Sequence, residues 1–422
     1  MSITSKKVPS ETQAKPQQEL YPYPRFSLAE RDRRWQAVRA LMREQGMDVI
    51  VCPSNTGHST DFQANSRYLS HVGGGGDSDI AVVFPLEGEV TAIATSAAPR
   101  WPTVQEWTAD VREARRAYGR AAVERLKELG VERGRIGVTG LGSGTRTPEG
   151  TVNYGFWKAI REAFPQAELV DATALLAQVR LVKSEEEIGV LTKSAQIIEK
   201  GVEAKIAAAR PGAVDWEVWA AAQYAMMRHG SEIPVHCNWV SGKNPVRTLT
   251  RPSFRTLERG DLIINELEAS WIGYRAQIVQ PVFVEIANPV HQELIKVQRE
   301  VFNVLMEHLK PGLTVGELME LAKHAGEKAA PSAGPAAGAE TKLTLHGRGA
   351  GDDGPIVTNN SRNPEDLAAK LQENMVFILK PSAEVKVKGE QYICTWGDTV
   401  VVTRNGGQRL GTLPHDLAVA GG

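Results

Sequence analysis

An acid and an amide, Glu266 and Gln277, lie eleven positions apart in the segment GDLIINELEASWIGYRAQIVQPVF, residues 260–283. Apolar and β-branched residues surround both positions and Gly273 separates them, which predicts two strands joined by a turn. In such a ribbon the two side chains can meet on one face. Glu266 there could act as a base or orient another group, with Gln277 as a hydrogen-bonding partner. We therefore expect the functional site at this ribbon.

Composition narrows the class of protein. The 422 residues are 42% hydrophobic and 23% charged, which is ordinary for a globular chain with room for two domains. A formal net charge of −1 gives no reason to expect nucleic acid or a membrane as partner. The cysteines Cys52, Cys237 and Cys394 form no C-x-x-C pair and favour a reducing cytoplasm, and no segment is apolar enough for a signal peptide or a membrane span.

Residues 1–24 are typical of a flexible arm, and three features organise the chain after it. Helix and strand patterns alternate over residues 25–178, which predicts an N-terminal α/β domain. Residues 179–422 then show helix, helix and strands twice over. A basic residue followed by Pro-Gly ends a helix in each copy, at 210–212 and 310–312. This weak duplication predicts a pseudo-symmetric α+β domain.

The strands that close the second copy are predicted at residues 376–379, 384–387, 392–395 and 399–403, as a curved antiparallel sheet. His346 lies before them in LHGRGAG, which predicts a glycine-rich turn that leaves the imidazole approachable. The glycines at 73–76 indicate a loop, and no helix follows it as in a phosphate-binding loop.

Several segments in order resemble the creatinase, prolidase and aminopeptidase P family over about residues 27–417. They are NSRYLSHV, RLVKSEEEIGVLTKSAQI, SGKNP, GDLIINE, IGYRAQIVQPVF, LHGRGAG, ENMVFILKP and GDTVVVT. The resemblance implies a creatinase-type N-terminal domain, ribonuclease H-like in fold, followed by a pita-bread catalytic domain. Among these relatives the chain is most similar to creatinase in its expected chemistry, because creatinase hydrolyses a C–N bond without metal.

The resemblance also implies a metal site, and this chain departs from it. Peptidases of the family hold two divalent metals with Asp, Asp, His, Glu and Glu. The corresponding positions here are Glu266, Gln277, His346, Lys380 and Gly397. Divalent metals need anionic or imidazole ligands, and an ammonium among them repels the ion. The sequence therefore predicts no metal and no other cofactor.

If the fold brings these positions together, Lys380 occupies the place of the metals. It would act as a clamp on an oxyanion or a carboxylate, and its pairing with Glu266 would keep both ionised. His346 would act as general acid or base. The alternative for Glu266 and Lys380 is a structural ion pair that replaced lost metals.

Further candidates for contact with substrate surround this group, although ordinary structural roles compete in each case. Aromatic residues usually belong to the core, and acids after a turn are usually solvated, as Asp352 and Asp353 would be. His71 and Asp77 belong to a loop, residues 71–79, that the resemblance predicts to reach the neighbouring subunit's site in a homodimer. The substrate-binding candidates are Gln277, His236, Asp353, Asp398, Trp271, Trp396, His71 and Asp77.

The sequence thus predicts a cytoplasmic, metal-independent hydrolase of a C–N bond in a small carboxylate- or amidine-bearing molecule. Its catalytic residues would be His346, Glu266 and Lys380. One alternative is a lyase or decarboxylase acting on a small organic acid. Others are a non-catalytic binding or scaffold protein and a divergent enzyme with a single metal.

Overall fold

The computed structural model describes residues 23–54, 64–73, 79–95, 98–233, 238–245, 251–358 and 363–421. The chain divides into two compact units, the first ending at Arg180 and the second beginning at Leu181. The domain boundary predicted between residues 178 and 179 falls inside helix α6 (Thr173–Leu181). No helix in the described ranges is long and apolar enough to cross a lipid bilayer.

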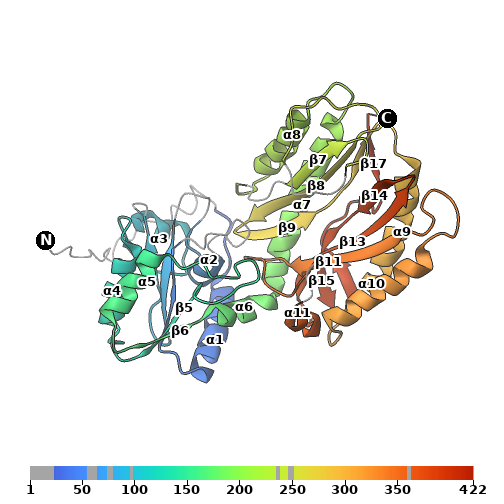
Figure 1. Cartoon of the computed structure of the whole chain (residues 1–422). Helices are drawn as coiled ribbons and strands as arrows, with labels where there is room; N and C mark the ends of the chain where they lie inside the picture. The colour runs from blue at the N-terminus through green and yellow to red at the C-terminus, as the bar shows by residue number, and fades with distance from the viewer. Residues whose placement is uncertain are drawn as a thin grey trace. The chain divides into compact units, whose positions relative to one another are not determined.

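The first unit is built on one six-stranded sheet in the order β4-β3-β2-β1-β5-β6 (Figure 1). Its central strand, β1, is antiparallel to β2 and parallel to β5, and all its residues are buried. Helices α4 and α5 bury apolar residues such as Leu126 and Ile160 in the same core cluster as the strand residues. The elements are α1 (Leu28–Glu44), β1 (Val49–Cys52), α2 (Ala64–Ser70), β2 (Ala81–Pro85), β3 (Thr91–Ala94), the 3₁₀ helix Ala98–Arg100, α3 (Trp101–Val104), β4 (Asp110–Glu113), α4 (Tyr118–Glu128), β5 (Arg135–Val138), α5 (Tyr154–Ala163) and β6 (Glu168–Asp171).

Two pairs of helices repeat in the second unit, and each copy turns in the same way. Gly212 and Gly312, which follow the first helix of each pair, have φ angles of 86° and 94°, a region that favours glycine. Ser184 and Glu187 form a reciprocal capping box at the start of α7, as their spacing predicts. The pairs are α7 (Glu185–Ala208) with α8 (Asp215–Arg228) and α9 (Pro289–His308) with α10 (Val315–Ala329).

The first sheet of the second unit contains the predicted ribbon. Strands β8 and β9 are antiparallel, and Gly273 at the turn between them has a φ of 78°. Of the strand predicted at 233–241, the structure shows β7 from Asn238, and residues 234–237 lie outside the described residues. The sheet has the order β17-β10-β8-β7, with β9 paired to β8, and its strands are β7 (Asn238–Gly242), β8 (Leu262–Trp271), β9 (Tyr274–Ile278), β10 (Val282–Val284) and β17 (Ala418–Ala420).

The second sheet corrects two predictions. Residues 376–387 form one strand, β13, where two were predicted. Up to Leu379 this strand pairs with β15, and from Ser382 it pairs with β14, so Pro381 lies at the change of partner and removes no ladder hydrogen bond there. Strand β11, which contains His346, was not predicted. The sheet has the order β12-β11-β13-β15-β16, with β14 paired to β13, and its elements are β11 (Glu340–Gly347), β12 (Ile356–Val357), α11 (Pro364–Ala368), β13 (Val376–Val387), β14 (Glu390–Thr395), β15 (Asp398–Thr403) and β16 (Gly406–Arg409).

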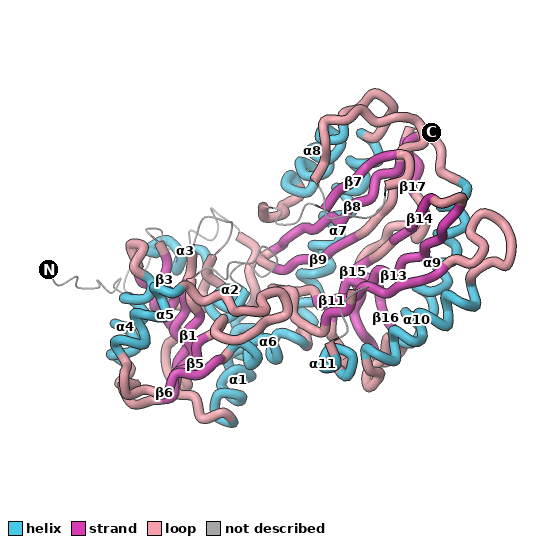
Figure 2. The backbone as a smooth tube through the Cα atoms, viewed as in Figure 1, coloured by secondary structure: helices cyan, strands magenta, loops and turns pink. Residues whose placement is uncertain are grey.

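The helices and the two sheets of the second unit meet around the ribbon. Helices α9 and α10, orange in Figure 1, pack against β13 and β11, while α7 packs against β8 and β9. Strand β9 approaches β13 and β15 (Figure 2). Main-chain hydrogen bonds of 2.9 and 3.1 Å between Val279 and Gly397 join the two sheets. The junction of the sheets is therefore fixed by backbone contacts next to Gln277 and Lys380.

Candidate active site

Lys380 lies between two polar groups of the ribbon. Its Nζ donates to Glu266 Oε1 at 2.7 Å and to Gln277 Oε1 at 3.0 Å. All three side chains are buried, with Lys380 only 3% exposed. A buried ammonium group is stabilised when an acid and further acceptors surround it. The structure thus brings Glu266, Gln277 and Lys380 together, with the ion pair that the sequence predicts.

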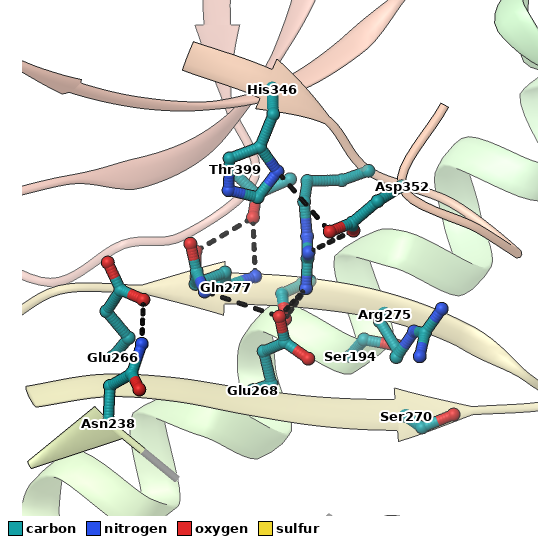
Figure 3. Close-up of polar contacts among 12 residues, drawn as sticks. Ser194, Asn238, Glu266, Glu268, Ser270, Arg275, Gln277, His346, Asp352 and Thr399 are labelled. Carbon is teal, nitrogen blue, oxygen red and sulfur yellow. Dashed lines mark hydrogen bonds and ion pairs between the residues drawn. The ribbon is translucent and has the colours of Figure 1, made fainter. Parts of the chain in front are cut away.

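The strand register explains this geometry. Gln277 lies directly opposite Glu268, and Glu266 lies opposite Asn238 on β7. Glu266 therefore meets Gln277 on the diagonal, through Lys380. Asn238 Nδ2 donates to Glu266 Oε2 at 2.7 Å (Figure 3), which leaves Oε1 for the lysine. Lys380 itself stands where β13 changes partners between β14 and β15.

A second buried cation, Arg348, extends the group. Its Nη1 donates to Asp352 Oδ1 at 2.6 Å, and its Nη2 forms a short ion pair with Glu268 Oε1. Gln277 Nε2 donates to the same Glu268 oxygen at 3.3 Å. Burial opposes the charged guanidinium, but the carboxylates of Glu268 and Asp352 outweigh it and raise the pKa of Arg348. A continuous chain of polar contacts therefore runs from Lys380 through Gln277 and Glu268 to Arg348 and ends at Asp352. We call Lys380, Glu266 and Gln277 the Lys380 group.

His346 is part of strand β11, so its predicted place in an approachable turn is wrong. Its side chain is buried, and its Nδ1 lies 3.8 Å from Asp352 Oδ2. Strand β11 pairs regularly with β13 as far as Gly347, so His346 belongs to the strand and not to a turn. Figure 3 shows His346 above Thr399 and Gln277, with Asp352 beside it. The imidazole therefore faces the ribbon from the second sheet.

The two acids after His346 are buried, so the expectation that both are solvated is wrong. Asp352 is 5% exposed and Asp353 is 4% exposed. Asp352 is enclosed because Arg348 binds it, and the main-chain oxygen of Asp353 accepts from Gly347 N at 3.1 Å. Asp353 therefore stays beside His346, and we retain it as a candidate.

Asp398 points away from the Lys380 group. Its neighbour Thr399 exchanges hydrogen bonds of 2.9 Å with the backbone of Gln277, so alternation along β15 directs Asp398 to the opposite face. There its Oδ2 accepts from Arg409 Nε at 2.7 Å. Burial raises the pKa of Asp398 to about 6, even though Arg409 opposes the shift. We do not carry Asp398 forward as a substrate contact.

The two tryptophan candidates have structural surroundings. Trp396 is fully buried in a core cluster, stacks on His415 with 3.9 Å between ring centroids, and donates from Nε1 to Gln280. Trp271 is the last residue of β8, five residues beyond Glu266. Its ring packs closely on Gly230, so a Cβ added at Gly230 would lie 2.5 Å from the ring. The packing of each tryptophan accounts for its position, and neither contacts Lys380, Glu266 or Gln277 through a hydrogen bond of the described residues.

The remaining candidates lie in the first unit or outside the described residues. His71 packs between Phe26 and Trp107, and its Nε2 accepts from Phe26 N at 3.2 Å. Asp77 and His236 are not among the described residues. The homodimer in which residues 71–79 reach a partner's site stays a prediction.

The residues around Lys380 do not fit a divalent metal. The Lys380 ammonium lies 2.7 Å from Glu266 Oε1 and 3.0 Å from Gln277 Oε1, where it would repel a bound cation. Across the described part of the chain, no three His, Cys, Asp or Glu side chains come together as a metal site. Gly397 has no room for a ligand, because a Cβ there would lie 2.6 Å from Lys380 Cβ.

This close contact predicts that Gly397→Ala destabilises the protein by about 1–3 kcal/mol, the usual cost of overpacking a core. The added methyl group would push against Lys380 Cβ and the main chain of Leu379. Urea unfolding measures the change. Gly242→Ala on β7 is the control, because a Cβ there meets no atom of the described residues within 4 Å. Equal effects of the two substitutions would contradict the proposed contact.

Sequence reasoning missed Glu268 and Arg348 as residues of the site. A signal for Glu268 was present: it follows Glu266 by two positions in the same predicted strand, so both acids share a face. Arg348 sits among glycines, and nothing in LHGRGAG indicates that its side chain is buried.

The second unit has the pita-bread fold, and the fold of the whole chain is shared with solved structures of other proteins. An X-Pro aminopeptidase from Thermotoga maritima superposes with a TM-score of 0.72 at 21% identity, over 91% of this chain and 99% of that one. An Xaa-Pro dipeptidase from Bacillus anthracis gives 0.71 at 20% identity, over 92% and 99%. The predicted fold class, a creatinase-type N-terminal domain with a pita-bread domain, is confirmed.

The chain belongs to Metallopeptidase family M24, whose profile matches residues 190–404. The profile of the Creatinase/Prolidase N-terminal domain matches residues 34–182. The Xaa-Pro dipeptidase of Pyrococcus horikoshii is 27% identical over 70% of this chain and 76% of its own length. A creatinase from a Bacillus species is 26% identical over 68% and 69%. The predicted family resemblance is confirmed, and these relatives are hydrolases.

Proposed function

We propose that the protein is a metal-independent hydrolase of a C–N bond in a small polar molecule. The observation that carries this proposal is the position of Lys380 Nζ, 2.7 Å from Glu266 Oε1 and 3.0 Å from Gln277 Oε1. An ammonium held at that point can stabilise negative charge on a substrate oxygen, as a metal does in the family's peptidases. Creatinase among the relatives supports C–N hydrolysis as the reaction class.

Each residue then has a defined role in hydrolysis. His346 accepts a proton from water as the water oxygen bonds to the substrate carbon. The displaced electron pair of the C=O or C=N bond moves to the heteroatom, and where that atom is oxygen Lys380 stabilises the charge. The pair then returns to re-form the double bond as the C–N bond breaks, and the leaving nitrogen takes the proton from His346. Glu266 keeps Lys380 charged and in place, and Asp352 lies beside the His346 ring.

Metal analysis gives the first test of this proposal. The purified protein is expected to hold no stoichiometric divalent metal, and chelation is expected to leave its turnover unchanged. Substrates would first be found by thermal-shift screening of small amides, guanidino compounds and carboxylates. A stoichiometric metal that is required for turnover would overturn the proposal and favour the alternative with a single metal.

Lys380→Met gives the second test. The substitution keeps most of the side-chain volume but removes the charge, so kcat is expected to fall about 100-fold, the usual loss for one oxyanion donor. Lys342→Met on the adjacent strand is the matched control, because Lys342 is partly exposed and pairs with Glu384. Unchanged turnover in Lys380→Met would remove the lysine from the mechanism.

A non-catalytic binding protein is the second candidate. The observation in its favour is that Lys380 and Arg348 both pair with buried acids, as in a purely structural ion network. This candidate predicts ligands that raise the melting temperature without being converted. Product formation with any compound of the screen would exclude it.

A further inference from the structure

The two ends of the Gln277 carboxamide face groups of opposite charge inside the site. Its Oε1 accepts from Lys380 Nζ at 3.0 Å, and its Nε2 donates to Glu268 Oε1 at 3.3 Å. An ammonium only donates and a carboxylate only accepts, so the two neighbours fix which end of the amide faces which. One planar amide therefore already lies with its oxygen toward the cation and its N–H group toward the acid.

One of the two carboxylate oxygens of Glu268 accepts no hydrogen bond from the described residues. Glu268 Oε1 accepts from both Gln277 and Arg348, whereas Oε2 is buried and has no hydrogen-bond partner among the residues that the structure describes. A buried carboxylate oxygen without a donor costs free energy, and such a group in a native structure needs an explanation. A hydrogen-bond donor on a bound ligand would satisfy this oxygen.

Arg348 holds this oxygen in a fixed place. The guanidinium binds Glu268 on one side and Asp352 on the other, and it is fully buried. Because two donors engage Oε1, rotation of the carboxylate would break two hydrogen bonds, so Oε2 keeps its direction. Glu268 lies opposite Gln277 on the ribbon (Figure 3), and Gln277 in turn accepts a hydrogen bond from Lys380.

We propose that Glu268 Oε2 accepts an N–H group of the substrate, so that the site binds planar amide, ureide or amidine groups with their nitrogen toward Glu268. A substrate amide would take the orientation of the Gln277 amide, with its oxygen toward Lys380. This inference rests on the proposed function for the identity of the scissile C–N bond. It assigns Glu268 a binding role that sequence reasoning missed, and it makes an N–H donor a requirement of the ligand.

The test measures binding of a small probe, since the side chains concerned are buried. Acetamidinium is the probe, and tetramethylammonium is the matched ligand with the same charge and no N–H. The wild-type protein is expected to bind acetamidinium at least tenfold more tightly by calorimetric titration. In Glu268→Gln the dissociation constant for acetamidinium is expected to rise tenfold or more, the loss expected for a charge-assisted hydrogen bond.

Two further variants control for folding. Glu30→Gln removes the charge of another buried acid that pairs with arginine, in the first unit, and is expected to bind acetamidinium like the wild type. Glu268→Asp keeps the pairing charge for Arg348 but withdraws the oxygen from the ligand. It is expected to weaken binding even if Glu268→Gln fails to fold.

The outcomes separate this inference from the proposed function. Acetamidinium has no oxygen for Lys380 and carries the same charge as the lysine, so Lys380→Met is expected to lose most of its turnover and to bind the probe at least as tightly as the wild type. Probe binding that depends on Glu268 in a protein without turnover would support the binding role and reject the hydrolase. Equal binding of the two cations, no binding by the wild type, or unchanged binding in the folded Glu268 variants would overturn the inference.

Discussion

Replacing Arg348 with Met is expected to lower the free energy of unfolding by about 3–5 kcal/mol. Arg348 is fully buried and is bound to Glu268 and to Asp352, which are themselves buried. Methionine fills much of the same volume but leaves two carboxylates close together without a cation. Removing one partner of a buried ion pair is costly because the remaining charge has lost its solvation and gained nothing in return.

Urea unfolding followed by fluorescence measures this loss, and two comparisons define its origin. Arg404→Met removes an exposed arginine that pairs with Glu373, and it should change stability by at most about 1 kcal/mol. A triple variant, Arg348→Met with Glu268→Gln and Asp352→Asn, removes all three charges and should recover most of the loss. If the triple variant is as unstable as the single one, the cost comes from packing and the electrostatic explanation is wrong.

The stability of the protein should rise with pH between about 7 and 9 because of Lys205. This lysine of α7 is fully buried, and its Nζ donates to the side chain of Asn265 and, at 2.6 Å, to the main-chain oxygen of Gln280. Burial lowers its pKa to about 7, from 10.5 for a solvated lysine. A neutral amine still has two N–H donors for these two acceptors.

The sign follows from the proton balance. Below about pH 7 both states are protonated, so the folded state bears the full cost of a buried ammonium. Between pH 7 and 10.5 only the unfolded state keeps the proton, so the free energy of unfolding rises by about 1.4 kcal/mol per pH unit. From pH 7 to 9 the wild type should gain about 2–3 kcal/mol relative to Lys205→Met.

Urea titrations at pH 6, 7, 8 and 9 measure this difference. Lys200→Met on the same helix is the control, because Lys200 is exposed and pairs with Glu203. Its difference from the wild type should stay nearly constant over this range. A constant difference between Lys205→Met and the wild type would show that Lys205 stays charged in the folded protein.

Local signals in the sequence were sufficient for most of the second unit. Pro-Gly pairs ended α7 and α9, the Ser184–Glu187 box started α7, and Gly273 marked the turn of the ribbon. The errors arose where long-range pairing decides. Pro381 suggested an interruption, yet β13 runs through it because the strand exchanges one neighbour for another there. Strand β11 was hidden by the glycines that follow His346.

The candidate site, too, could be predicted only in part, because long-range pairing determines it. Glu266, Gln277 and Lys380 could be brought together from the sequence only through family resemblance, since 103 positions separate Gln277 from Lys380. Burial of Asp352 could not be predicted, because acids after a turn are usually solvated and only the position of Arg348 encloses this one. Glu268 was missed although alternation placed it beside Glu266. Charge pairs across sheets depend on register, and local composition does not encode register.

The contact between Gly397 and Lys380 also bears on the spacing of the two main chains. A Cβ at position 397 and the Cβ of Lys380 cannot coexist at 2.6 Å without movement of the main chain. Every residue except glycine has a Cβ, so on this backbone the clash would arise with any side chain at 380, whether lysine or another residue. A larger residue at 397 therefore requires a wider spacing of the two strands, and glycine at 397 is what allows the main chains to approach as closely as they do.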